Sequence, residues 1–200
     1  GAETVIPLLA EPYENREDRS SWCAMSFSGR RDIEAALRGE RLGPQDIFSC
    51  PELDEVEVLA RSLRMDKAVV LNGQTGSGKS ITAYQALYRL TREGFEILRL
   101  RDNARTCSLR TLLNDLAQFP HKKVLLVDDA QDMSPDTVRE LAEAAAADLL
   151  ILIVGIDHVA GGVRTVHLSA RLAVVRLSRF VREERATLFP RIRDLDNSVG

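Results

Sequence analysis

From residue 68 onward, short runs of mostly apolar residues alternate with longer segments in which apolar side chains recur every three or four positions. The short runs predict strands that are buried on both faces, and the longer periodic segments predict helices. Strands that alternate with helices are typical of a parallel sheet covered by helices. The pattern therefore predicts an α/β fold of three layers whose sheet has five parallel strands, at residues 68–71, 95–100, 124–127, 149–154 and 173–177.

Capping residues mark where several helices should begin. Ser49 is followed three residues later by Glu52, which resembles a capping box and predicts the start of a helix. Ser108 and Ser134 each stand in front of a further periodic segment. Because serine is favoured at helix N-caps, we expect each of these two serines to cap a helix.

The segment after the first predicted strand reads GQTGSGKS over residues 73–80. This is the spacing of the P-loop, G-x-x-x-x-G-K-[ST], and the motif has the strand before it and the helix after it that it requires. The glycines allow successive backbone N–H groups to point inward around an anion at the start of a helix. Lys79 is expected to reach the β- and γ-phosphates of a nucleotide, and the Ser80 hydroxyl to ligate Mg²⁺. The residues predicted to bind the nucleotide are Gly73, Gln74, Thr75, Gly76, Ser77, Gly78, Lys79, Ser80 and Ile81.

A second motif ends the third predicted strand, where the apolar run 124–127 is followed by Asp128 and Asp129. An apolar strand that delivers a carboxylate at its C-terminal end is typical of a Walker B element. Asp128 is then expected to hold Mg²⁺ through its water shell, across from Ser80. Asp129 is placed to orient or deprotonate the attacking water, which makes Lys79 and Asp129 candidate catalytic residues.

The composition is that of an ordinary globular protein, with 44% hydrophobic and 28% charged residues and a net charge of −3. The longest apolar run, at 149–154, is far too short to span a bilayer, and we expect no membrane segment and no secretory signal. The cysteines are odd in number and lack metal-ligand spacing, which predicts a reduced, cytoplasmic protein. The segment 164–193 is rich in arginine, which favours either a solvated helix face or contact with nucleic acid or a partner.

Together, these motifs resemble those of P-loop ATPases that have an additional strand between the P-loop strand and the Walker B strand, here at residues 95–100. This group includes the AAA+ ATPases and the signalling STAND NTPases, and the resemblance covers about residues 46–190. Asp-Asp-Ala-Gln at residues 128–131 is similar to the Asp-Glu-Ala-Gln of AAA+ helper ATPases of transposition and secretion. The double Asp also resembles STAND proteins, and residues 27–31 are similar to their Gly-Arg-Glu motif.

The resemblance implies a sheet in the order 5-1-4-3-2, with strands numbered along the chain, and Mg·ATP bound at the C-terminal ends of the strands. ATP is favoured over GTP because the chain lacks the Asn-Lys-x-Asp motif of guanine recognition. In AAA+ ATPases an arginine at the position of Arg171 reaches the nucleotide of a neighbouring subunit. Arg171 is therefore either a catalytic arginine finger or part of a structural salt bridge.

We expect three parts in the chain. Residues 1–45 form an N-terminal arm with a short helix at residues 31–38. The arm is irregular to about residue 26 because it mixes prolines with charges and shows no periodicity. Residues 46–179 form the P-loop ATPase core. Residues 180–200 begin a helical lid, so we expect the chain to be part of a longer protein.

Two functions remain open on these grounds. One is an AAA+-like ATPase that binds and hydrolyses Mg·ATP to drive or regulate a macromolecular assembly, as a homo-oligomer or within a larger protein assembly, with DNA as a candidate partner. The other is a STAND-like signalling switch with slow or negligible turnover, since Asp129 is shorter than the Glu of many hydrolytic relatives. A third alternative is a P-loop that serves as an interaction scaffold.

Overall fold

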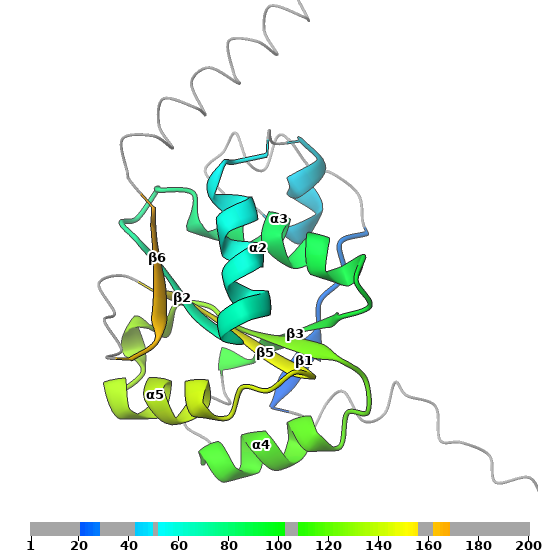
Figure 1. The fold of residues 1–200 in the computed structure, drawn as a ribbon, viewed down its shortest axis with the longest axis vertical. Helices are drawn as coiled ribbons and strands as arrows, with labels where there is room; N and C mark the ends of the chain where they lie inside the picture. Colours follow the sequence, from blue (N-terminus) through cyan, green and yellow to red (C-terminus); the bar gives the residue numbers. More distant parts are fainter. Residues whose placement is uncertain (1–20, 29–42, 50–51, 103–107, 156–161, 169–200) are drawn as a thin grey trace, which may run out of the picture.

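The computed structural model describes residues 21–28, 43–49, 52–102, 108–155 and 162–168. The strands in these segments are β1 (Trp22–Ala24), β2 (Ala68–Gly73), β3 (Glu96–Leu100), β4 (Lys123–Val127), β5 (Leu149–Gly155) and β6 (Arg164–Leu168). They form one six-stranded sheet in the order β1-β3-β4-β5-β2-β6 (Figure 1). In this order all neighbouring strands are parallel except the pair at one edge, where β1 is antiparallel to β3. The fold is thus an α/β fold with a mostly parallel sheet.

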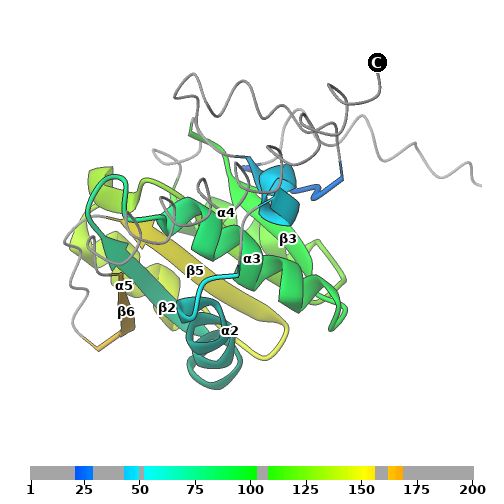
Figure 2. The same cartoon turned by 90° about the horizontal axis from the view of Figure 1, so that it is seen from above.

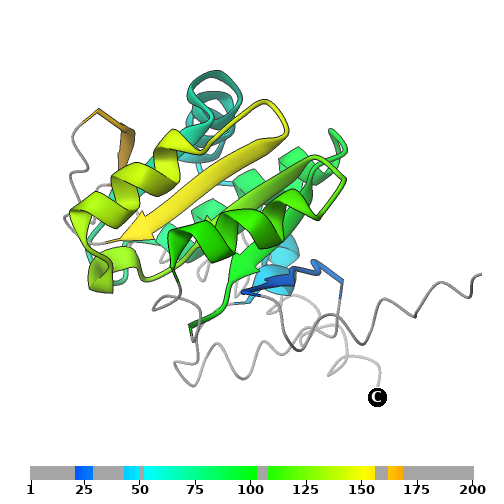
Figure 3. The ribbon, with the colours of Figure 1, turned by 90° about the horizontal axis from the view of Figure 1, so that it is seen from below.

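Helices cover both faces of this sheet. The helices are α2 (Glu55–Asp66), α3 (Lys79–Thr91), α4 (Leu109–Ala117) and α5 (Pro135–Glu143), with short 3₁₀ turns η3 (Pro44–Ser49) and η5 (Ala130–Asp132). Figure 2 shows α2 and α3 in front of the sheet, and Figure 3 shows α4 and α5 in front of the opposite face. Two hydrophobic clusters, one on each face, fill the space between sheet and helices.

Strand β5 shows why the apolar runs carry no helical period. All of its residues are buried. Leu150 and Leu152 pack in the cluster under α2 and α3, whereas Ile151 and Ile153 pack in the cluster under α4 and α5. Successive side chains of a strand point to opposite faces, so a strand covered on both sides needs apolar residues at every position.

Two of the predicted helix starts are confirmed. The Ser108 hydroxyl accepts a hydrogen bond from the backbone N–H of Thr111 at the start of α4. The Ser134 hydroxyl accepts the equivalent bond from Thr137 at the start of α5. Each serine satisfies a backbone donor that the first helical turn leaves without an intrahelical partner.

The helix start predicted at Ser49 is wrong. Helix α2 begins at Glu55, and residues 44–49 form the separate turn η3. The reason is tertiary, because the backbone N–H of Leu53 donates to the Gln85 side chain of α3 at 3.3 Å. Leu53, just before α2, is therefore held against α3.

The prediction of five strands in the order 5-1-4-3-2 is also corrected. Strands β2, β5, β4 and β3 do lie side by side in the predicted succession 1-4-3-2, but the strand beyond β2 in the described residues is β6. The strand predicted at residues 173–177 and the helix predicted at 31–38 lie outside the described residues. The sixth strand, β1, falls in the predicted irregular arm, since three residues are too few to show a period of two.

Strand β1 is held by side-chain contacts as well as by its ladder. Its Trp22 ring meets the ring of Phe119 edge-on, with centroids 5.2 Å apart. The Arg101 guanidinium donates to the Trp22 carbonyl at 3.2 Å.

Among the described residues, no helix is both long and apolar enough to cross a membrane.

We expect Leu152→Ala to lower the free energy of unfolding by about 2–5 kcal/mol, because it leaves a cavity in the central strand between two helical layers. Urea unfolding followed by circular dichroism measures this loss. Leu113→Ala on α4 removes the same atoms from a half-buried position and should cost distinctly less. Equal losses at the two positions would contradict the placement of β5 at the centre of the core.

Candidate functional site

The glycine-rich segment 73–80 connects the C-terminal end of β2 to the first turn of α3. Gly76 and Gly78 have φ angles of 77° and 88°, and Gly78 is the N-cap residue of α3. These are left-handed backbone conformations, which residues other than glycine adopt at a cost of about 1–2 kcal/mol. The loop thus curls at the N-terminus of a helix, where backbone N–H groups and the helix dipole favour an anion.

Gly73 is required by close packing rather than by its φ angle. A Cβ atom at this position would lie 2.6 Å from the Ser77 Oγ and 3.3 Å from the backbone oxygen of Leu168. The Ser77 side chain is 2% exposed, and within the described residues its hydroxyl has no hydrogen-bond partner. The loop therefore folds back tightly over the ends of β2 and β6, with a polar atom enclosed beneath it.

The Lys79 ammonium is turned back onto the loop. It donates hydrogen bonds to the carbonyl oxygens of Gly73, at 2.6 Å, and Gln74, at 2.8 Å. Burial lowers the pKa of Lys79, and the negative charges of Asp128 and Asp129 act in the opposite direction. The structure thus brings Lys79 within electrostatic reach of both carboxylates that follow β4.

Pairing through β5 sets the height of Asp128 relative to the loop. Strand β5 pairs Val154 with Leu71 of β2 and Ile153 with Val127 of β4. Asp128 follows Val127 and therefore lies level with Leu71, across one intervening strand, which corresponds to about 10 Å between the two backbones. Both motifs consequently meet at the C-terminal edge of the sheet, where open parallel sheets bind ligands.

The two aspartates differ in their surroundings. Asp128 is 7% exposed, and its Oδ1 accepts a hydrogen bond from the backbone N–H of Asp129 at 3.0 Å. Asp129 is half-buried and has a left-handed backbone, with φ of 50° and ψ of 45°. Asp and Asn tolerate this conformation better than most residues. The chain turns there into η5.

Sequence reasoning missed one charged neighbour of this site. The Arg99 guanidinium on β3 lies 3.9 Å from Asp128 Oδ2. The available signal was a charged residue near the C-terminal end of an otherwise buried strand, flanked by Leu98 and Leu100. The predicted order already placed this strand beside β4, but the register between the two strands decides whether the side chain reaches Asp128, and the sequence pattern does not specify that register.

The remaining predicted residues divide into three groups. Gln74, Thr75 and Gly76 are exposed at the outside of the loop, and Ser80 is half-buried in the first turn of α3. The Ile81 side chain is 5% exposed and packs in the core, which leaves its backbone N–H as the group that faces the loop. Arg171 lies outside the described residues.

The side-chain oxygen atoms at this site show whether a divalent cation could bind there. Within the described residues, no group of three or more His, Cys, Asp and Glu side chains is arranged to hold a metal ion. Mg²⁺ fits a sparser donor set, because it usually keeps several waters and binds through one or two protein oxygens and the substrate phosphates. The Ser80 hydroxyl and the buried Asp128 carboxylate match that requirement in chemistry.

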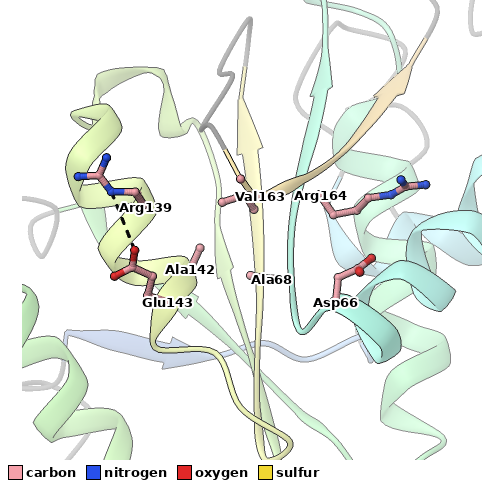
Figure 4. Close-up of a pocket in the computed structure, with 8 residues that line it drawn as sticks. Asp66, Ala68, Arg139, Ala142, Glu143, Val163 and Arg164 are labelled. Atoms are coloured by element: carbon pink, nitrogen blue, oxygen red, sulfur yellow. Dashed lines mark ion pairs between the residues drawn. The ribbon is translucent and has the colours of Figure 1, made fainter.

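A cavity of about 310 Å³ lies at the other end of the sheet (Figure 4). Ala68 and Arg164, the first residues of β2 and β6, line it together with Arg139, Ala142 and Glu143 of α5. Arg139 and Glu143 form an ion pair at its edge. Because this cavity is at the N-terminal ends of the strands, it is separate from the loop and the two aspartates.

In a comparison with known proteins, the chain matches one family model and is remotely similar to several solved structures. A family model described as novel STAND NTPase 5 matches residues 46–159. No curated protein matches the sequence. The matching stretch begins in η3, contains the loop and both aspartates, and ends just after β5.

Three solved structures are remotely similar to this chain. An E. coli MS115-1 HORMA:CdnC:Trip13 complex has 15% identity and a TM-score of 0.47 over 75% of this chain and 67% of that one. C. elegans PCH-2 has 13% identity and a TM-score of 0.44 over 62% of this chain and 46% of that one. An S. cerevisiae Hsp104:casein complex has 13% identity and a TM-score of 0.48 over 70% of this chain and 32% of that one. This chain thus spans less than half of the PCH-2 and Hsp104 chains, and no function is taken from these likenesses.

We expect Gly73→Ala to weaken binding of a fluorescent ATP analogue by about tenfold or more, since the new methyl group displaces Ser77 and the loop around it. Gly94→Ala is the matched control, because Gly94 has a φ of 87° and open space around it, remote from the loop. It should cost about 1 kcal/mol of stability and leave binding unchanged. Equal affinities in the two variants would contradict the tight loop as the binding element.

Proposed function

We propose that this chain, which belongs to the novel STAND NTPase 5 family, binds Mg·ATP at the loop 73–80 and acts as a nucleotide-dependent switch with slow turnover. One observation carries the proposal: the curled loop with Lys79 at its base and the Asp128 carboxylate lie at the same edge of the sheet, across one strand. A cation, a ring of backbone donors and two carboxylates at the C-terminal edge of a parallel sheet are the parts that phosphoryl transfer uses.

The loop supplies the phosphate-binding part of the site. Backbone N–H groups of residues 74–81 and the N-terminus of α3 bind the phosphates. Lys79 exchanges its two carbonyl acceptors for phosphate oxygens, with which an ammonium forms stronger, charge-assisted hydrogen bonds. The added negative charge favours the protonated lysine and so opposes the lowering of its pKa by burial.

The opposite side of the site supplies oxygen ligands and orients water. Ser80 and Asp128 would hold Mg²⁺, which neutralises phosphate charge when it is bound. Asp129 follows the buried Asp128 and itself has a left-handed backbone. It would orient the attacking water or accept its proton. ATP is the expected nucleotide, and a cytoplasmic location stays a prediction.

Family membership favours the switch over the assembly-driving ATPase. A carboxylate one methylene shorter than glutamate reaches less far toward a water, which is consistent with slow turnover at Asp129. The alternative remains an AAA+-like ATPase in which Arg171 of one subunit completes the site of another. A homo-oligomer or larger assembly, with DNA as a candidate partner, belongs to that alternative.

Lys79→Ala should lower the affinity for a fluorescent ATP analogue by about tenfold to a hundredfold, because it removes a hydrogen-bonded charge from the phosphate site. Lys122→Ala is the control, since Lys122 is exposed and lies over the Phe95 ring, away from the loop. Both affinities are measured by fluorescence titration with Mg²⁺ present. A Lys79→Ala variant that binds as tightly as the unchanged protein would refute the site.

ATP turnover as a function of protein concentration separates the two functional classes. For a switch we expect slow turnover per molecule that is flat with concentration and unaffected by DNA or by Arg171→Ala. A rate that rises with concentration and falls at least about tenfold in Arg171→Ala would instead support an arginine finger acting between subunits. That result would overturn the switch in favour of the assembly-driving ATPase.

A further inference from the structure

Arg99 is held in place by strand pairing on both of its sides. It pairs with Cys23 of β1 on one edge of β3 and with Leu126 of β4 on the other. Its neighbours Leu98 and Leu100 pack in the cluster under α4 and α5. Because side chains alternate along a strand, Arg99 points to the other face, where α3 and the loop lie.

The two oxygens of Asp128 have different partners. Oδ1 accepts the backbone N–H of Asp129 at 3.0 Å, and Oδ2 lies 3.9 Å from the Arg99 guanidinium. The Asp128 side chain is 9% exposed, whereas that of Arg99 is 38% exposed. A carboxylate so little exposed to water needs a cation or hydrogen-bond donors nearby to stay ionised.

Lys79 is a second cation at this edge of the sheet. Its ammonium donates to two loop carbonyls. Arg99 by contrast is in ion-pair range of Asp128 Oδ2. Arg99 therefore lies beside the carboxylate, and Lys79 is hydrogen-bonded to the loop.

We propose that Arg99 is a positioning residue that competes with Mg²⁺ for Asp128. The inference rests on the proposed nucleotide site. The Arg99 guanidinium approaches Asp128 through Oδ2, an oxygen to which a hydrated cation can also bind. A metal ion that approaches Oδ2 must displace Arg99 and is repelled by its charge.

This competition has a definite consequence for the metal. Arg99 attracts the carboxylate before any ligand arrives, and it raises the Mg²⁺ concentration at which the metal-bound site forms. Because the guanidinium is partly exposed, solvent screens the repulsion, and the effect is expected to be severalfold rather than orders of magnitude. Nucleotide binding without Mg²⁺ should depend on Arg99 much less.

The test titrates Mg²⁺ against binding of a fluorescent ADP analogue and, separately, measures the affinity of that analogue in EDTA. In Arg99→Gln we expect the Mg²⁺ midpoint to fall by about three- to fivefold and the affinity in EDTA to change by less than about twofold. Arg99→Met, which keeps the aliphatic stem, should give the same shift. Arg99→Lys, which keeps the charge, should stay near the unchanged protein.

Arg110→Gln is the matched control, since Arg110 is exposed on α4, on the far face of the sheet, and its Mg²⁺ midpoint should not move. A role of Arg99 in folding alone would lower the melting temperature without shifting the midpoint. An unchanged or raised midpoint in both neutral variants, with nucleotide still bound, overturns the competition and leaves the proposed function intact. Absence of nucleotide binding in the unchanged protein overturns both.

Discussion

Strand β5 is the constraint on which the rest of the molecule depends. It forms parallel ladders with β2 on one side and with β4 on the other, and every one of its residues is buried. The loop follows β2 and the two aspartates follow β4, so the spacing between them is set by a strand that contributes no side chain to the described site. Hydrogen bonds on both edges and apolar contacts on both faces leave this strand little freedom to move.

The site itself is organised by the burial of charge. Two cations, Lys79 and Arg99, and two carboxylates, Asp128 and Asp129, gather at one edge of the sheet. Lys79 is satisfied by loop carbonyls and Asp128 by a backbone N–H group and a guanidinium. Each of these contacts is with a group that a phosphate or a metal ion can replace. The site therefore offers contacts that a bound phosphate or metal ion can exchange, as the proposed switch requires.

Much of the fold follows from local patterns. Four of the strands and the serine caps of α4 and α5 were predicted, because side-chain period and capping chemistry act within a few residues. The predicted start of α2 was wrong, because the backbone N–H of Leu53 donates a hydrogen bond to the Gln85 side chain of another helix, α3. Strand β1 was missed because its ladder and its contact with Phe119 come from residues far along the chain.

The sequence by itself determined the chemistry of the loop: glycines where the backbone turns left-handed or packs closely, and Lys79 and Ser80 at the first turn of a helix. These requirements are local, so they are written in consecutive residues. Only the tertiary structure decided the register between the strands and the edge positions of β1 and β6, and with the register came the contact between Arg99 and Asp128. Such a contact depends on hydrogen-bonded ladders between distant segments, and no pattern along a single strand specifies its register with a neighbour.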